Sequence, residues 1–300
     1  MYVVTGATGH TGNVVARTLL TKGEKVRAIS RTPSHLKDLA AQGAEPFSAD
    51  VTDAAALIRA FAGAKAVYVL IPPNPASSDV PAFQKRVSDA LAQALQRSRV
   101  PYAVVLSSIG ADKPDKTGPV LGLRYLEQQL DQIEGLNVLH LRAGYFMENT
   151  FTQVGMIRNM GMAAGPLRPD LKLPLIASQD IGEVAAKALL SLDFHKQQTR
   201  ELHGQRDLDM SEVAQIIGKA ISKADLRYTQ APDDQVRNGM MQFGLSGNMA
   251  DLILQMAAAL NSGYMRPLEP RSPQNTTHTT YEAFVQHELV PLYQGKSAAA

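Results

Sequence analysis

The first twelve residues contain a glycine-spaced turn of the kind that binds a dinucleotide pyrophosphate. Glycines stand at positions 6, 9 and 12, between the apolar run Tyr2–Val4 and a segment with helical apolar spacing. Without side chains the backbone can approach phosphates closely, and the first amides and the dipole of the next helix favour negative charge. The candidate phosphate contacts are Gly6, Thr8, Gly9, His10, Thr11 and Gly12.

The residues after the second and third apolar runs indicate which dinucleotide is bound. An acid at the end of the second strand would hold the ribose of NAD, whereas an arginine accommodates the 2′-phosphate of NADP. Residues 26–34 contain no acid, and Ser30 is followed by Arg31, whose guanidinium suits a phosphate. Asp50 is placed to accept from the adenine amino group and Val51 to pack on the ring. We therefore expect NADP(H) rather than NAD.

Composition excludes several other classes of protein. The 300 residues are 45% hydrophobic and 19% charged, with a net charge of +2, so we expect neither a nucleic acid nor a membrane as partner. The absence of cysteine excludes disulfides and thiol catalysis, and no histidines have metal-ligand spacing, so no metal is expected. A strand follows the first residue directly, without a signal peptide, which favours a cytoplasmic protein. We expect a monomer or a homodimer.

Strand and helix patterns alternate through the first half of the chain and predict the element that positions these residues. The strands are apolar on both faces and helix-length segments separate them, which is typical of a doubly wound parallel Rossmann sheet in an α/β protein. Expected strands are Tyr2–Thr5, Lys25–Ser30, Glu45–Ser48, Ala66–Ile71, Ala103–Ser107 and Val138–Arg142, and expected helices are 13–22, 34–41, 53–61, 79–97 and 119–133.

Beyond about residue 143 the alternation loosens, and a smaller, mostly helical C-terminal lobe that covers the substrate is expected. We predict a cofactor domain over 1–150, to which 177–205 returns, and a lobe over 151–300. Ser178 is the expected cap of a helix over 179–191, and Asp209 with Glu212 forms a capping box for a helix to about 222. Further helices are expected near 232–243 and 247–260, before an irregular stretch over 262–280.

Several segments resemble the NmrA-like group of atypical short-chain dehydrogenases/reductases. They are Thr5–Gly12, the Ser30-Arg31 step, Ala49–Val51, Leu141–Asn149 with its Met-Glu-Asn block, and Gln179–Ala186. The group includes NADPH-dependent quinone and dye reductases as well as redox-sensing regulators that bind the dinucleotide without turnover. The resemblance implies the fold and an NADP(H) cofactor.

The resemblance also implies further contacts to the cofactor. Ile71, Pro72 and Pro73 would lie near the nicotinamide ribose, and Ser107 with Ser108 would flank the nicotinamide. Tyr145 and Phe146 would wall its pocket, while Lys85 resembles a helix lysine that reaches the cofactor in some members.

The chain lacks the tyrosine–lysine pair of conventional short-chain reductases. In those enzymes a tyrosine that donates the proton stands four residues before a lysine, on the helix after strand five. Tyr125 comes nearest, but Gln129 stands four residues later. Leu123 occupies the position at which several NmrA-like members carry lysine or histidine. Tyr125 as proton donor and Ser108 as orienting hydroxyl are the candidate catalytic residues.

An NADP(H)-dependent reductase of a quinone or similar conjugated apolar electrophile fits these features. Such acceptors stabilise their own negative charge, so positioning of the nicotinamide supplies much of the catalysis without a strong acid. A non-catalytic NADP(H)-sensing regulator is the alternative, favoured by Leu123. A nucleotide-sugar epimerase shares the fold, but it relies on the absent tyrosine and lysine.

Overall fold

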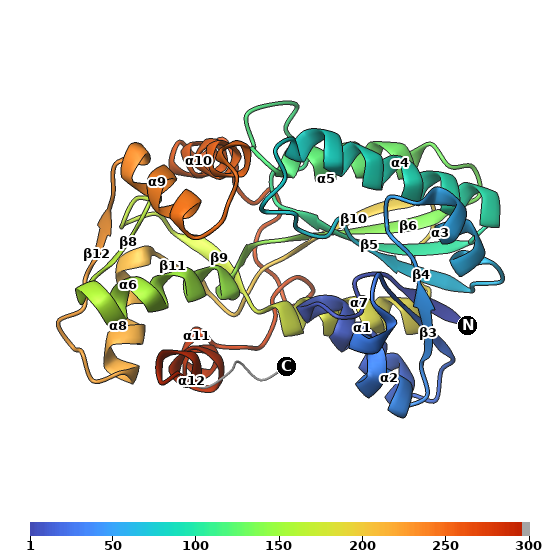
Figure 1. The fold of residues 1–300 in the computed structure, drawn as a ribbon, viewed down its shortest axis with the longest axis horizontal. Coiled ribbons are helices and arrows are strands. Elements are labelled where there is room, and N and C mark those ends of the chain that lie inside the picture. The colour runs from blue at the N-terminus through green and yellow to red at the C-terminus, as the bar shows by residue number, and fades with distance from the viewer. Residues whose placement is uncertain (296–300) are drawn as a thin grey trace.

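A seven-stranded parallel sheet forms the core of the computed structural model, which describes residues 1–295. The order β10-β6-β5-β4-β1-β2-β3 places β1 and β4 next to each other, so the strand order reverses between them. Figure 1 labels β10, β6, β5 and β4 within the sheet. The strands are β1 (Tyr2–Val4), β2 (Val26–Ser30), β3 (Glu45–Ser48), β4 (Ala66–Val69), β5 (Tyr102–Ser108), β6 (Asn137–Ala143) and β10 (Gln197–Leu202). This arrangement confirms the predicted doubly wound sheet.

Helices cover both faces of this sheet. Two apolar clusters, one on each face, hold the helices to the strands. One face carries α1 (His10–Thr21), η1 (Pro33–Leu36), α2 (Lys37–Ala41) and α7 (Ser178–Ser191), and the other carries α3 (Ala54–Phe61), α4 (Val80–Ser98) and α5 (Val120–Asp131). Because all crossovers start at the carboxyl ends of the strands, the loops after the strands gather at one edge, where ligands of such sheets bind.

The chain returns to the sheet after entering the lobe. Gly182 on α7 lies against α1, where a Cβ atom would come within 2.6 Å of the Val14 side chain. β10 then pairs in parallel with β6, from Gln197 opposite Val138 to Leu202 opposite Ala143. No strand was expected here, because the sequence Gln-Gln-Thr-Arg-Glu-Leu is polar at an exposed sheet edge.

A third apolar cluster forms the core of the C-terminal lobe, on the left of Figure 1. Two small sheets, β11-β9-β7 and β12-β8, lie among its helices. The elements are β7 (Tyr145–Phe146), η2 (Met147–Phe151), α6 (Thr152–Met160), β8 (Ala163–Gly165), β9 (Leu173–Ile176), β11 (Asp207–Leu208), α8 (Met210–Ala220), β12 (Tyr228–Gln230), α9 (Asp233–Gln242), α10 (Gly247–Asn261), α11 (Tyr281–Phe284), η3 (Val285–Leu289) and α12 (Val290–Tyr293).

The two predicted helix caps of this region have different outcomes. Asp209 and Glu212 form the expected capping box at α8, with each side chain accepting from the other's backbone amide at 2.9 Å. The prediction for Ser178 is wrong, because α7 starts at Ser178 itself with Ala177 as its N-cap. The Ser178 hydroxyl and amide both donate to Glu148 Oε1, so the cap comes from a distant carboxylate.

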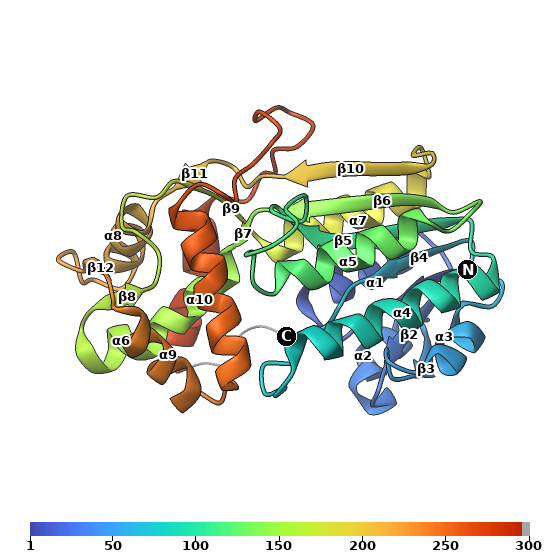
Figure 2. The ribbon, with the colours of Figure 1, turned by 90° about the horizontal axis from the view of Figure 1, so that it is seen from above.

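Residues 262–280 form an irregular loop, which buried side chains tie to β10 and to α7. The buried Glu201 carboxylate accepts from the amides of Leu268 and Glu269. Both oxygens of Asp180, at the start of α7, accept from Thr279. Figure 2 shows this loop rising beside β10. Within residues 1–295, no helix is both long and apolar enough to cross a membrane.

Candidate cofactor and substrate site

The turn between β1 and α1 has a geometry that requires glycine. Gly6 adopts a φ of +61°, and a Cβ atom on Gly12 would lie 2.3 Å from the Gly6 carbonyl oxygen. The Gly9 amide closes the turn by donating to the Gly6 carbonyl at 2.9 Å. Gly9 is the N-cap of α1 and has no side chain to cover the first amides of the helix. Thr8, Gly9 and His10 are exposed, so an anion can approach this helix start.

Thr11 serves the core with its side chain. Its buried hydroxyl accepts a 3.0 Å hydrogen bond from the Tyr68 hydroxyl on β4, and burial raises the pKa of that phenol. Thr5 Oγ1 donates to the Tyr68 carbonyl at 3.1 Å and completes the connection. We therefore restrict the expectation for Thr11 to its backbone. Its hydroxyl instead holds the glycine turn against β4.

The ends of β2 and β3 bring Arg31 and Asp50 together, since Ser30 pairs with Ser48 across the two strands. Asp50 Oδ1 accepts from the Thr52 amide at 2.8 Å and the Thr52 hydroxyl at 2.7 Å. These bonds, with a smaller contribution from the Arg31 charge, lower the pKa of Asp50. The Ser30 hydroxyl is bonded to the Thr32 amide. Arg31 itself is exposed, as a residue that receives a phosphate must be, and Val51 packs against the core.

The next two loops extend the edge of the sheet. Ile71 and Pro72 are half-buried and Pro73 is exposed behind the end of β4. Ser108, the last residue of β5, is also half-buried, and its hydroxyl donates to the Ile109 carbonyl at 2.9 Å. These positions leave all four residues as candidate contacts.

Ser107 points in the other direction, into a buried charge network. Its hydroxyl donates to Glu127 Oε1 at 2.6 Å, and Arg142 forms a two-pronged ion pair with the same carboxylate at 2.6 and 3.0 Å. Burial opposes the charge of Arg142, yet the Glu127 carboxylate holds its pKa above the usual value. Only the backbone of Ser107 therefore remains as a candidate contact to a ligand.

Tyr125 and Lys85 meet each other between α5 and α4. The Tyr125 hydroxyl donates to Asp89 Oδ1 at 2.7 Å, and Lys85 binds the other oxygen of Asp89 at 2.7 Å. The Lys85 ammonium also lies 5.1 Å from the centre of the Tyr125 ring. Both candidates are thus engaged on the surface of the two helices, which argues against proton donation by Tyr125 and against a cofactor contact by Lys85.

The two residues of β7 face different cores. Phe146 packs against the cluster under α1 and α7, while Tyr145 packs against that of the lobe. Burial raises the pKa of Tyr145 to about 12, against a smaller lowering by a hydrogen bond with Asn149. Tyr145 and Phe146 therefore lie at the joint between the sheet and the lobe, where a pocket wall is expected.

Sequence reasoning missed the role of Glu148. Its Oε1 atom accepts from the amide and hydroxyl of Ser178 and so caps α7. This connects the segment after β7 to the helix that packs against α1. The Met-Glu-Asn block that marks the family contains this residue, but the sequence does not show which distant helix it caps.

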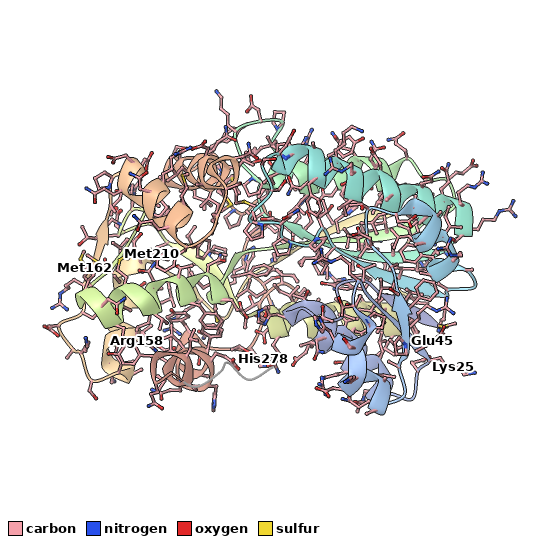
Figure 3. The ribbon with its side chains drawn as sticks, viewed as in Figure 1. Lys25, Glu45, Arg158, Met162, Met210 and His278 are labelled. Atoms are coloured by element: carbon pink, nitrogen blue, oxygen red, sulfur yellow. The ribbon has the colours of Figure 1, made fainter. Side chains whose placement is uncertain are left out.

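A group of possible metal ligands lies at the start of α7, where the sequence predicted no metal. His278 Nε2 is 3.6 Å from Asp180 Oδ1 and 4.0 Å from Glu183 Oε2. Figure 3 shows His278 in the middle of the molecule, between the lobe and α1. Both oxygens of Asp180 already accept from Thr279, so this carboxylate is accounted for as an anchor of the loop.

Comparison with known proteins shows one family and several reductases. The model of the NmrA-like family matches residues 2–285. The chain is 27% identical to an NAD(P)H azoreductase of Xenophilus azovorans over 92% of this chain and 93% of that one. It is 25% identical to quinone oxidoreductase 2 of Escherichia coli over 88% of this chain and 89% of that one.

Solved structures agree in fold. An NADPH complex of the quinone oxidoreductase QOR2 from Escherichia coli superposes with a TM-score of 0.81 at 23% identity, covering 96% of this chain and 99% of that chain. The triphenylmethane reductase of Citrobacter sp. complexed with NADP(H) superposes with a TM-score of 0.78 at 18% identity, covering 95% and 99%.

Proposed function

Because the chain belongs to the NmrA-like family, we propose that it is an NADP(H)-dependent reductase of quinones or similar conjugated, apolar electrophiles. Support comes from relatives named as an NAD(P)H azoreductase and a quinone oxidoreductase, each matched over most of its length. The observation that carries the proposal is that the glycine turn, Arg31 and the end of β5 lie along the same edge of the sheet.

The residues at this edge fit a phosphorylated dinucleotide. The glycine turn lets a pyrophosphate approach the start of α1, where a Cβ atom on Gly12 would block the turn itself. Arg31 offers an exposed guanidinium to a 2′-phosphate, and Asp50 beside it is held charged by Thr52. Tyr145 and Phe146 then close the site on the side of the lobe.

The protein's contribution to the reaction is positioning. A bound NADPH would supply the hydride. Ser108 and the Ile71–Pro73 loop would hold the nicotinamide in place, and the lobe would exclude water from an apolar acceptor. Because the Tyr125 hydroxyl is bonded to Asp89, no protein acid is assigned. This suits acceptors whose negative charge is delocalised and whose proton comes from water.

A redox-sensing regulator without turnover is the second candidate function. Leu123 favours it, since an apolar residue stands where several family members carry a basic one. An epimerase is less well supported, because it relies on the tyrosine–lysine pair that this chain lacks, although a nucleoside-diphosphate-sugar epimerase from Staphylococcus aureus shares the fold.

Oxidation of NADPH tests the proposal directly. The purified protein is mixed with NADPH and a panel of quinones and azo dyes, and the absorbance of the reduced nicotinamide is followed against a control without acceptor. We expect acceptor-dependent loss of this absorbance. Tight binding of NADPH without oxidation by any acceptor would overturn the reductase and support the regulator.

A further inference from the structure

Helix α10 is bonded to the loop after β4. The Ser246 amide, at the N-cap of α10, donates to the Pro75 carbonyl at 2.8 Å. Asn248 Oδ1 accepts from the Val80 amide, the first of α4, at 2.8 Å. Two residues at the start of a lobe helix therefore hold both the loop that contains Ile71–Pro73 and the helix that follows it.

The same helix is bonded to the loop after β5. Gln255 Oε1 accepts from the Gly118 amide at 3.0 Å. Gly118 has a φ of +59°, and a Cβ atom there would lie 2.0 Å from the Leu252 carbonyl oxygen. The loop that follows Ser108 thus lies, at Gly118, with its backbone directly against α10. Figure 2 shows α10 on the side of the lobe that faces α4 and α5.

A contact between α4 and α5 closes these links into a ring. Gln84 Nε2 donates to the Pro119 carbonyl at 2.9 Å, next to Gly118. A Cβ atom on Gly122 of α5 would lie 2.3 Å from Gln84 Oε1, so the two helices touch here. Hydrogen bonds and the chain between them therefore connect α10, the loop after β4, α4 and the loop before α5 in a closed ring, so each bond limits the movement of the segments that the others join.

We propose that α10 sets the separation of the two loops that flank the nicotinamide, and that Asn248 and Gln255 are positioning residues for hydride transfer. This inference rests on the proposed reductase function. Neither side chain is assigned a contact with the reacting atoms; each acts through a backbone amide of a flanking loop. A small misplacement of reacting groups has a large effect on rate, so loss of either bond lowers kcat.

The test compares Asn248→Ala and Gln255→Ala with a control on the same helix. Asn261→Ala is that control, since within residues 1–295 the Asn261 side chain bonds only to the Arg168 amide and the Pro166 carbonyl, inside the lobe. We expect each test variant to lose roughly tenfold in kcat, with KM for NADPH within about twofold of wild type. Asn248→Asp and Gln255→Glu keep a side-chain oxygen that accepts from the loop amide, now as part of a carboxylate, and should recover kcat. Normal kcat in both alanine variants, or an equal loss in Asn261→Ala, would overturn the proposal.

Amide hydrogen exchange tests the same proposal without requiring turnover. In the double variant Asn248→Ala/Gln255→Ala, we expect the segments 72–80 and 109–119 to exchange at least about tenfold faster, while Asn261→Ala matches wild type there. Unchanged exchange would contradict positioning by α10. A wild-type protein that binds NADPH but reduces no acceptor would refute the reductase instead, so the two failures are distinguishable.

Discussion

The Tyr125 hydroxyl on α5 donates a 2.7 Å hydrogen bond to Asp89 on α4, beneath the ammonium of Lys85. Burial of Asp89 opposes its charge, but the bonds from Lys85 and Tyr125 lower its pKa. A tyrosine and a lysine thus do meet in this fold, although they come from different helices. Their shared partner is a carboxylate, which keeps both away from the role of a catalytic acid pair.

Tyr125→Phe should therefore leave catalysis intact. The variant loses one hydrogen bond on a partly exposed surface and keeps the ring under Lys85, so kcat is expected within about twofold of wild type. Steady-state oxidation of NADPH with the best quinone measures this. A large fall in kcat at unchanged KM would restore Tyr125 as the proton donor.

Arg31→Glu should change the preference between the two dinucleotides. A carboxylate repels the 2′-phosphate and accepts from ribose hydroxyls, so the Kd for NADPH should rise by at least about tenfold more than that for NADH. Fluorescence titration with each reduced dinucleotide measures both. Arg97→Glu, exposed in the last turn of α4 at the opposite edge of the sheet, is the charge-matched control. Equal changes for the two dinucleotides would show that Arg31 does not contact the phosphate.

Glu127→Gln should destabilise the fold, because it leaves the positive charge of Arg142 without its carboxylate partner. Glu127 is 7% and Arg142 15% exposed, and a buried pair that loses one charge costs about 3 kcal/mol of unfolding free energy. Urea unfolding measures the loss. Glu45→Gln is a matched control, because Glu45 pairs with Arg27 in the same two-pronged way but is half exposed and should cost less than about 1 kcal/mol. Similar losses in the two variants would contradict the special role of the buried pair.

The buried tyrosines predict a late phase in alkaline titration. Burial raises the pKa of Tyr145 from 10.0 to about 12, and raises those of Tyr68, Tyr228 and Tyr281 as well. Because the pKa values of these phenols are higher in the folded than in the unfolded chain, the protonated phenols contribute to the stability of the fold. This contribution is fully present below about pH 10 and is lost as the pH rises through the folded pKa values. The protein has nine tyrosines and no tryptophan, so phenolate absorbance reports them clearly.

In the folded protein we expect only part of the tyrosines to ionise near pH 10, and the rest to ionise as the chain unfolds. Circular dichroism at each pH assigns the phases. Tyr145→Phe should remove one equivalent from the late phase and none from the early one. Complete ionisation in a single early step, with the fold retained, would contradict the burial of these phenols.

Local patterns predicted much of the fold. The glycine turn depends on backbone conformation within a few residues, and the capping box at Asp209 depends on neighbours three positions apart. Most strands of the sheet are buried and apolar on both faces, so they too were visible as short runs. β10 was missed because a polar edge strand lacks this signal, and its pairing with β6 depends on residues some sixty positions away.

The sequence by itself determined six of the seven strands of the sheet, the glycine turn and the absence of an acid after β2, since each depends on residue types and short-range spacing. Only the tertiary structure decided that Tyr125 bonds to Asp89, that Glu148 caps α7, and that α10 is hydrogen-bonded to the segments that follow β4 and β5. These contacts join residues 30 to 168 positions apart, and which side chains meet depends on how helices pack on the sheet. The spacing of residues along the sequence does not determine that packing.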